Sequence, residues 1–364
     1  MVKYILAFFV FISNLCLANM ASPIQEGTHA ITAISSKDIA ILNENIRISI
    51  DKYFNKAFYQ VEYTIRTESG GVQIPLLFHA RDYLGKFKVW LDGKAVELKE
   101  VPLSPQDTLK RFDGFSDAFR KTDSPFPTEL LVRYDVHSGR YFPLSDFVYF
   151  EVDLSKGVHQ ISVEYVGGVW ADRSGWLKKY SFRYFLSPAR EWKSFHELYV
   201  SIDASAFKET IHSNLGKPDS GSLKQTAHWT FKGIPSDYIE LSYQPKPSNF
   251  AGLLIGISPL GLTLIFGLVL ILLHIGVIRF LIKRSKMILS SFVVVAGSIL
   301  IPFVILAGYT FSYDVIDSAI GMHAGRYHGY TFLVVFLYVI VMPVYWLGIH
   351  QITTSFKRSF ARKL

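Results

Sequence analysis

Histidine, aspartate, glutamate and cysteine side chains do most catalysis and metal binding in proteins, and here they are widely spaced. The seven histidines before Ser248 lie 16 or more residues apart, whereas metal sites draw ligands at short spacing. The chain has no G-x-S-x-G, H-E-x-x-H or P-loop motif. We therefore predict no catalytic residue, no metal site and no cofactor, and interpret these histidines as ordinary surface or strand-end residues.

An aromatic and basic segment between Tyr165 and Tyr184 is the first candidate for a functional surface. Tryptophan, tyrosine and arginine are enriched at protein interfaces, and aromatic rings also stack on sugars. The same residues can pack in a strand corner or lie at lipid headgroups. Partner or membrane contact, core packing and glycan binding all stay open. The candidate interaction residues are Trp170, Arg173, Trp176, Lys178, Tyr180 and Arg183.

Polar residues inside otherwise apolar stretches are the second group of candidates. His274 and His350 are ionisable groups near the ends of such stretches, and intramembrane ionisable groups are functional candidates. Gly252 and Gly256 form a G-x-x-x-G pattern, which lets membrane helices approach closely. We expect these glycines to support helix packing. The segment 322–328, with His323 and His328, reads as a loop at headgroup level.

Three long uncharged stretches determine where these residues lie. They cover 247–278, 287–313 and 327–356, and roughly 20 apolar residues suffice to cross a bilayer as a helix. We predict a three-helix transmembrane domain. Its expected segments are helix 249–278, cytoplasmic loop 279–286, helix 287–311, outer loop 312–328, helix 329–350 and basic cytoplasmic tail 351–364.

The first 18 residues predict an export signal. Lys3 precedes an apolar run that ends in smaller residues at Cys16 and Ala18, which is typical of a secretory signal peptide. We expect cleavage after Ala18, although an uncleaved anchor and a lipoprotein signal at Cys16 stay open. Cys16 is the only cysteine, so a cleaved chain would form no disulfide.

The net charge of +8 is confined to the signal and the membrane segments. After Ser248 the chain carries nine of its 38 Lys and Arg residues but only two of its 30 Asp and Glu residues. The exported region 19–248 is therefore neutral, which argues against nucleic acid as a partner. Because basic residues stay in the cytoplasm, we predict a multi-pass protein of the cytoplasmic (inner) membrane with an exported N-terminal domain and a cytoplasmic C-terminus.

Region 19–248 reads as β-strands, because apolar and polar residues alternate repeatedly. Asp92-Gly93 predicts a type I′ hairpin turn. We expect an antiparallel β-sandwich, or two smaller ones in tandem, with an excursion at 104–145 that is rich in Asp, Pro and Phe. The alternation is found at Ile46-Ile48-Ile50, Val61-Tyr63-Ile65, Val148-Phe150-Val152, Ile161-Val163-Tyr165, Leu198-Val200-Ile202 and Ile239-Leu241-Tyr243.

Several segments of this region resemble a group of uncharacterised bacterial exported proteins. These segments are 37–41, 46–49, 61–63, 184–192 and 198–200. The resemblance implies a signal peptide followed by a β-rich envelope domain. It implies no activity, because the group has none assigned.

Together these patterns favour a non-enzymatic, membrane-anchored envelope protein. Its exported domain would bind another envelope component or serve as an accessory or assembly subunit. The expected partners are the lipid bilayer and an envelope protein or a second copy of the chain. Two alternatives stay open: a component of a membrane enzyme or transporter complex, and a glycan-binding module.

Overall fold

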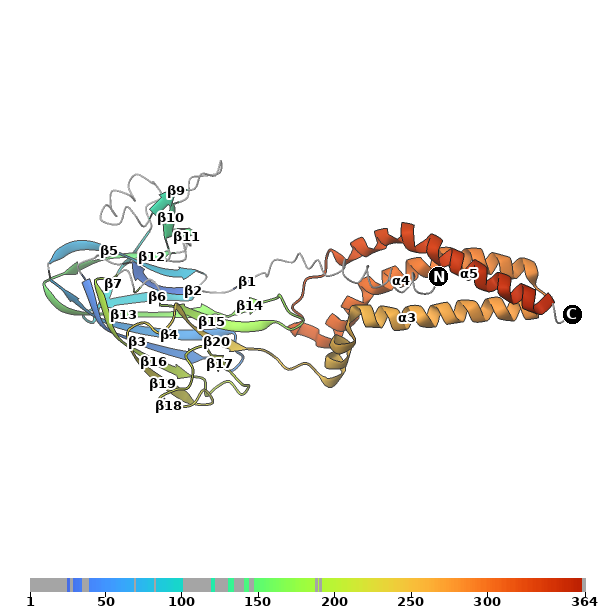
Figure 1. Cartoon of the computed structure of the whole chain (residues 1–364). Coiled ribbons are helices and arrows are strands. Elements are labelled where there is room, and N and C mark those ends of the chain that lie inside the picture. Colours follow the sequence, from blue (N-terminus) through green and yellow to red (C-terminus); the bar gives the residue numbers. More distant parts are fainter. Residues whose placement is uncertain are drawn as a thin grey trace. The chain divides into compact units, whose positions relative to one another are not determined.

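A computed structural model shows two compact units (Figure 1). The β unit spans Ile24–Asp172 and Lys179–Gln244, and the helical unit includes Arg173–Lys178 and Pro245–Leu364. The predicted signal peptide 1–18 lies outside the described residues. The structure describes residues 25–26, 29–34, 39–68, 70–81, 83–100, 119–121, 130–133, 141–143, 147–186, 189 and 192–361.

The larger sheet of the β unit, sheet A, has nine strands. Its strands are ordered β1-β14-β15-β2-β5-β12-β8, and β20 pairs with both β15 and β17. Their bounds are β1 Gln25–Glu26, β2 His29–Ile34, β5 Gly71–Arg81, β8 Leu98–Lys99, β12 Phe147–Leu154, β14 Trp170–Asp172, β15 Lys179–Phe185, β17 His212–Ser213 and β20 Tyr238–Tyr243.

Sheet B has eight strands, and a third sheet has three. Sheet B is ordered β18-β19-β16-β3-β4-β13-β6-β7, with β3 Ile39–Ile50, β4 Lys56–Thr67, β6 Leu84–Leu91, β7 Lys94–Val96, β13 Gly157–Gly168, β16 Ser194–Asp203, β18 Ser220–Gly221 and β19 Thr226–Lys232. The three-stranded sheet is ordered β11-β10-β9, with β9 Phe119–Lys121, β10 Leu130–Arg133 and β11 Tyr141–Pro143. It falls within the predicted excursion 104–145, whose other residues lie outside the described part of the chain.

The alternating patterns in the sequence correspond to strands of both large sheets. All six predicted segments are confirmed, and they lie in β3, β4, β12, β13, β16 and β20. In β4, for example, Val61, Tyr63 and Ile65 are buried while the residues between them are partly exposed. This is the burial that one apolar face of a sheet requires.

The predicted two-residue hairpin turn is also confirmed. Asp92 and Gly93 have φ angles of 49° and 77°, and Leu91 pairs with Lys94 across the turn. Two successive positive φ angles are the requirement of a type I′ turn, which Asp-Gly meets at little steric cost.

The prediction that all strands pair antiparallel is wrong for two pairs. Strand β16 runs parallel to β3, and β15 runs parallel to β2. Parallel neighbours need a long crossover between them, because a tight hairpin can join only antiparallel strands. The long chain between β3 and β16 provides this crossover, which short-range alternation in the sequence does not reveal.

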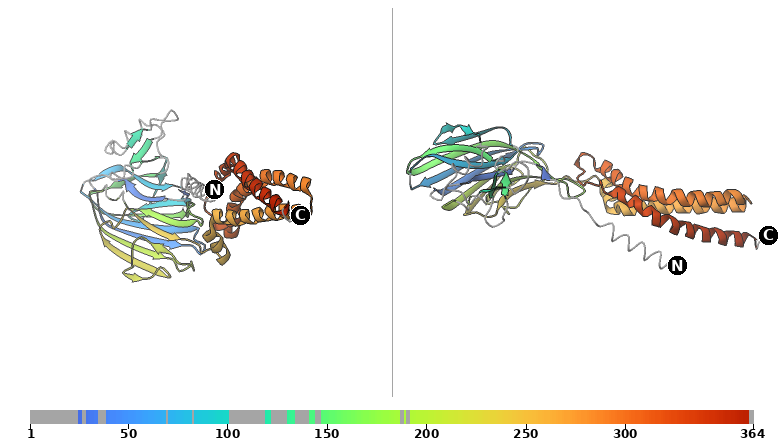
Figure 2. Two further views of the ribbon diagram at one scale, coloured as in Figure 1. Left: turned by 45° about the vertical axis from the view of Figure 1, so that its right-hand side comes forward. Right: turned by 90° about the horizontal axis from the view of Figure 1, so that it is seen from above.

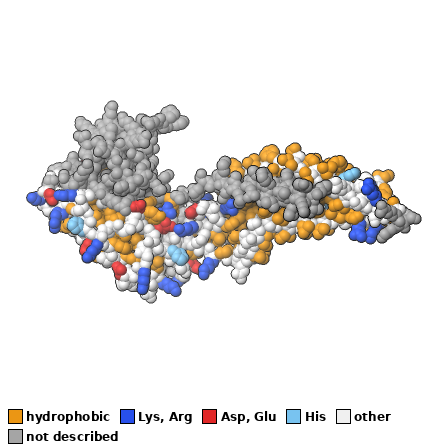
Figure 3. Space-filling model, in the orientation of Figure 1, with side chains coloured by type: hydrophobic (Ala, Val, Ile, Leu, Met, Phe, Trp, Pro, Cys, Tyr) orange, Lys and Arg blue, Asp and Glu red, His pale blue; other side chains and the backbone are white. Residues whose placement is uncertain are grey.

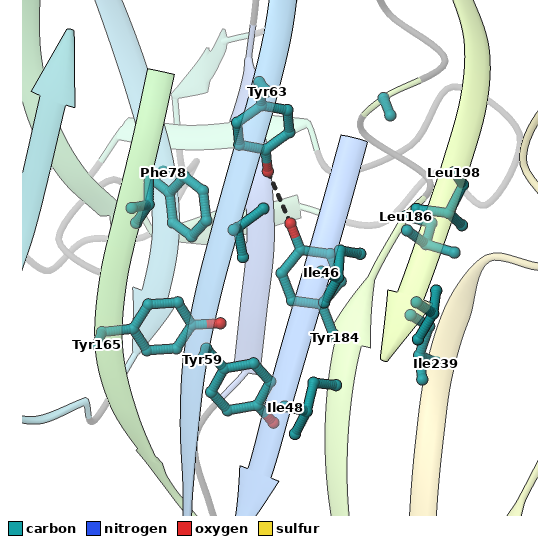
Figure 4. Packing of buried hydrophobic residues seen from close by; sticks show 14 of the residues in the cluster. Ile46, Ile48, Tyr59, Tyr63, Phe78, Tyr165, Tyr184, Leu186, Leu198 and Ile239 are labelled. Carbon is teal, nitrogen blue, oxygen red and sulfur yellow. Dashed lines mark hydrogen bonds between the residues drawn. The ribbon is translucent and has the colours of Figure 1, made fainter. Parts of the chain in front are cut away.

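Side chains from sheets A and B meet in one hydrophobic core. The core includes Ile46, Ile48 and Tyr63 from sheet B, together with Tyr184 and Leu241 from sheet A. Figure 4 shows Ile46, Ile48, Tyr63 and Tyr184 within this core, with the hydroxyl groups of Tyr63 and Tyr184 pointing toward one another.

Within the described residues, the helical unit contains three helices that are long and apolar enough to span a membrane. Its elements are α3 Asn249–Lys283, α4 Met287–Ile320, the 3₁₀ turns η4 Gly321–His323 and η5 Thr331–Leu337, and α5 Tyr338–Ala361. Figure 2 shows these helices running alongside one another. Large apolar side chains are exposed along them, and Figure 3 shows many hydrophobic side chains on the part of this face that is not covered by grey atoms. Such a surface suits contact with lipid or another membrane helix.

Helix α3 is interrupted near its start. Ser258 has φ 68° and ψ 161°, which is not helical, and Pro259 follows it. Proline lacks an N–H group and clashes with the preceding turn, so this position is a kink. The kink divides α3 into a short first part and a long second part.

Candidate functional site

The six candidate interaction residues fall into two groups. Trp170, Tyr180 and Arg183 belong to the β unit, whereas Arg173, Trp176 and Lys178 belong to the helical unit. The single surface expected from the sequence is therefore divided between two sets of neighbours.

The group in the β unit is packed among other residues of sheet A. Trp170 is 5% exposed, and the guanidinium group of Arg183 lies 4.8 Å from its ring centroid. Arg183 also pairs with Glu240, with 3.3 Å between Nη2 and Oε2. Tyr180 stacks on Tyr243 at 6.2 Å. A buried cation–π contact with a carboxylate partner stabilises local structure.

Trp176 is the centre of the group in the helical unit. Its ring stacks on Tyr313 with 5.6 Å between centroids, and His328 lies 5.5 Å away. The guanidinium group of Arg326 lies 5.1 Å from the same ring. Tyr313 and His328 also contact each other at 4.6 Å. We call Trp176, Tyr313, Arg326 and His328 the Trp176 cluster.

Backbone hydrogen bonds hold the segment 173–178 against the segment 321–325. The Lys178 N–H donates to the His323 carbonyl at 2.9 Å, and the Gly325 N–H donates to the Trp176 carbonyl at 3.0 Å. A Cβ atom at Gly325 would lie 2.8 Å from the Gly175 carbonyl oxygen. Only glycine permits this approach. The segment 322–328, predicted as a headgroup-level loop, thus has a defined partner segment.

Asp317 adds a charged contact that the sequence analysis missed. Its Oδ2 lies 2.6 Å from Nε2 of His328, whose side chain is only 11% exposed. The spacing of Tyr309, Tyr313 and Asp317 could have indicated that Asp317 lies on the same helix face as the two tyrosines, because residues four apart share one face. The hydroxyl groups of Tyr309 and Tyr313 are 2.9 Å apart, which confirms that they are neighbours.

His274 is buried where the three helices meet. Its Nδ1 lies 2.9 Å from the Tyr345 hydroxyl on α5, and its Nε2 lies 3.0 Å from the Val293 carbonyl on α4. A carbonyl oxygen can only accept, so Nε2 carries a proton, and in the neutral ring Nδ1 accepts from Tyr345. Both ring nitrogens therefore have partners from other helices, which is the arrangement of a residue that joins helices.

His350 and the two glycines of the G-x-x-x-G pattern occupy different surroundings. His350 is exposed, and its ring lies 5.7 Å from that of Trp346. Gly252 and Gly256 lie before the kink at Ser258, and a Cβ atom at either would meet no atom within 4 Å. In the described part of the chain, these glycines therefore make no close helix contact.

The β unit contains a buried polar cluster that the sequence analysis did not identify. Glu44 on β3 has an exposed fraction of 0%, and its Oε1 accepts a hydrogen bond of 2.7 Å from the Tyr184 hydroxyl. The hydroxyl groups of Tyr184 and Tyr63 are also 2.7 Å apart. Burial raises the pKa of Glu44 to about 7, although the hydrogen bonds from Tyr184 and Tyr63 oppose this effect.

A β-bulge directs Glu44 into the core. Ile39 and Ile41 point inward at odd positions, but Glu44 and Ile46 point inward at even positions. The pairing of β3 with β4 shifts register between Ile41 and Asn43, so one extra residue changes the phase. The change from odd to even apolar positions in the sequence is a signal that could have predicted this burial.

No metal-binding group emerges from the described residues. They contain no cluster of three or more His, Cys, Asp or Glu side chains able to hold an ion. Trp170, Trp192 and Trp229 are each less than 7% exposed, so these three do not form an open stacking platform for a sugar. Trp90 and Trp176 are partly exposed.

A scan against protein-family models and a search of curated proteins both found no match. A "putative nutrient binding protein" from Legionella pneumophila has 15% identity and a TM-score of 0.39, covering 59% of this chain and 70% of that chain. Yeast LTA4 hydrolase has 9% identity and a TM-score of 0.30, covering 57% and 29%. An M1 zinc metallopeptidase from Deinococcus radiodurans has 10% identity and a TM-score of 0.26, covering 59% and 40%.

The chain spans less than half the length of the last two proteins. At such low identity and TM-score, the similarities carry no conclusion about activity, substrate or partner. The proposals below therefore depend on the residues and contacts of this chain.

Proposed function

We propose that the chain is a non-enzymatic envelope protein anchored in the cytoplasmic membrane by its helical unit. The β unit is exported and forms a β-sandwich. It binds another envelope component, or serves as an accessory or assembly subunit. The partner is an envelope protein or a second copy of the chain, and the C-terminus is cytoplasmic.

The observation that carries this proposal is the helical unit. Its three apolar helices follow a β unit that has a core of its own. Apolar side chains such as Leu272, Phe292 and Phe336 are 59%, 67% and 70% exposed on these helices. In water this surface would be unfavourable at about 25 cal/mol per Å², whereas in lipid it is solvated.

The charged residues at the two ends of the helices support the orientation. Arg279, Lys283, Arg284 and Lys286 lie around the connection of α3 to α4, and Lys357 and Arg358 lie near the end of α5. Asp314 and Asp317 lie near the end of α4, at the other end of the hairpin formed by α3 and α4. Basic residues are retained in the cytoplasm during insertion.

The core of the β unit supports the sandwich. Residues of sheets A and B contribute to one hydrophobic cluster, as two facing sheets do. A single cluster from Ile39 to Leu241 also favours one sandwich over two in tandem. The binding role is supported by the neutral charge of 19–248 and by its lack of a catalytic motif.

Photo-crosslinking in native membranes tests the binding role. A photoreactive phenylalanine derivative replaces Tyr53 or Tyr199 in the β unit, which are 65% and 38% exposed, or Phe336 in η5. We expect at least one position to give a reproducible adduct of defined mass, identified by mass spectrometry. An adduct of twice the chain mass would identify a second copy. The absence of any adduct from all three positions would refute the accessory role.

A further inference from the structure

Tyr184 connects the two large sheets through polar contacts. It lies on β15 of sheet A, whereas Glu44 and Tyr63 lie on β3 and β4 of sheet B. The Tyr184 hydroxyl lies 2.7 Å from both Glu44 Oε1 and the Tyr63 hydroxyl (Figure 4 shows the contact between the two tyrosines). The polar contact therefore lies between sheets, inside an otherwise apolar core.

Among the described residues, no positive charge acts on Glu44. The titratable groups that interact with it are Tyr63 of β4, Tyr165 of β13 and Tyr184 of β15, and Tyr59 of β4 stacks on Tyr184. Burial raises the pKa of each of these tyrosines, so all four are neutral. An unpaired carboxylate is unfavourable in such surroundings.

Two polar atoms of this cluster are buried without a hydrogen bond. They are Glu44 Oε2 and the Tyr165 hydroxyl oxygen. A carboxylate oxygen with no donor is costly, and more so when it is charged. Protonation removes that charge, and burial in fact raises the pKa of Glu44 to about 7. The Oε2 atom without a hydrogen bond and the raised pKa of Glu44 therefore both favour the protonated carboxyl group.

We propose that Glu44 is a buried proton-binding site that makes the cohesion of sheets A and B depend on pH. The proton keeps the carboxyl group neutral while Tyr184 and Tyr63 hold it between the sheets. Loss of the proton places a negative charge in the core, where the tyrosine hydroxyl groups stabilise it only in part. This role is independent of the proposed binding function.

The direction of the effect follows from proton binding by the two states. In the unfolded chain, a glutamate loses its proton around pH 4.3. In the folded β unit, Glu44 keeps its proton until about pH 7. The folded state binds more protons between these values, so stability falls as pH rises through this window. Below and above this pH window, Glu44 does not contribute to the change of stability with pH.

The test compares the wild-type chain with the variant Glu44→Gln, both as full chains in lipid nanodiscs. Glutamine keeps the shape and an acceptor for Tyr184 but cannot ionise. The wild-type folding equilibrium constant of the β unit should fall roughly a hundredfold between pH 4 and pH 8 relative to that of the variant. Glu62→Gln, in the adjacent strand β4, is the control and should keep the wild-type pH slope.

A second measurement stays informative even if Glu44→Gln folds poorly. Infrared difference spectroscopy of the wild-type chain should detect the C=O stretch of a neutral buried carboxyl group at pH 6, lost above pH 7. The same pH dependence of stability in wild type and Glu44→Gln would overturn the proposal. So would a wild-type spectrum without a neutral carboxyl group at pH 6.

Discussion

The imidazole ring of His274 occupies the space that a side chain at position 297 would need. A Cβ atom at Gly297 would lie no farther than 2.8 Å from three atoms of the His274 ring. The ring can therefore reach the Val293 carbonyl on α4 while it also contacts Tyr345 on α5. One glycine thus permits the polar contact that joins three helices, as small residues do in membrane proteins.

The variant Gly297→Ala should destabilise the helical unit. The added methyl group forces the His274 ring away from one or both of its partners, and overpacking of this kind costs about 1–3 kcal/mol. Thermal unfolding in detergent, followed by circular dichroism of the helices, should show a midpoint several degrees below wild type. Gly252→Ala is the matched control, because its Cβ would meet open space. Equal midpoints for the two variants would show that the His274 contact is unimportant.

Tyr184 and Tyr63 should differ in their contributions to the stability of the β unit. Tyr184→Phe leaves Glu44 without its 2.7 Å donor, which should cost about 1–3 kcal/mol at neutral pH. Tyr63→Phe keeps that hydrogen bond and should cost less. Chemical denaturation of the full chain in nanodiscs, read from the fluorescence of the buried tryptophans, measures both. A larger loss from Tyr63→Phe would contradict the assignment of Tyr184 as the main donor.

The contact between Asp92 and His159 should give a separate pH dependence. Oδ2 of Asp92 lies 2.7 Å from Nδ1 of His159, and this hydrogen bond raises the pKa of His159 despite partial burial. Burial opposes ionisation of Asp92, but the hydrogen bonds from His159 and the Gln160 N–H leave its pKa below the ordinary value. The pair therefore stabilises the fold most between about pH 4 and pH 6.5.

Asp92→Asn tests this pair, because asparagine keeps an acceptor for Gln160 and tolerates the positive φ angle. Asp92 is partly exposed, so the expected loss is about 0.2–1 kcal/mol at pH 6. The loss should decrease as pH rises past the raised pKa of His159. The difference between wild type and variant cancels the contribution of Glu44. A loss that is constant from pH 6 to pH 9 would exclude an ionic contribution.

Strands and spans could be predicted from the sequence because their signals are local. The alternation at Val61, Tyr63 and Ile65 determines one buried face of β4, and Asp92-Gly93 determines its own turn. Each of the three apolar stretches is longer than the roughly 20 residues with which a helix crosses a bilayer. In each case, neighbours in sequence are also neighbours in space, so the pattern alone is sufficient.

Non-local contacts could not be predicted in this way. Glu44 and Tyr184 are 140 residues apart in sequence, and Trp176 contacts Tyr313 across a similar separation. The parallel pairing of β16 with β3 depends on the whole chain between them. The G-x-x-x-G pattern of Gly252 and Gly256 likewise names no partner, and in the described part of the chain no atom lies within 4 Å of a Cβ built at either glycine.

Cysteine labelling tests whether the β unit is exported and the C-terminus is cytoplasmic. Cys16→Ser removes the chain's one cysteine, so an introduced cysteine is a unique reporter. Ser222→Cys in the β unit and Ser359→Cys near the end of α5 are both at exposed positions. A membrane-impermeant maleimide should label Ser222→Cys in intact spheroplasts and Ser359→Cys only after the membrane is broken. Labelling of Ser359→Cys in intact spheroplasts, or protection of Ser222→Cys, would contradict the account.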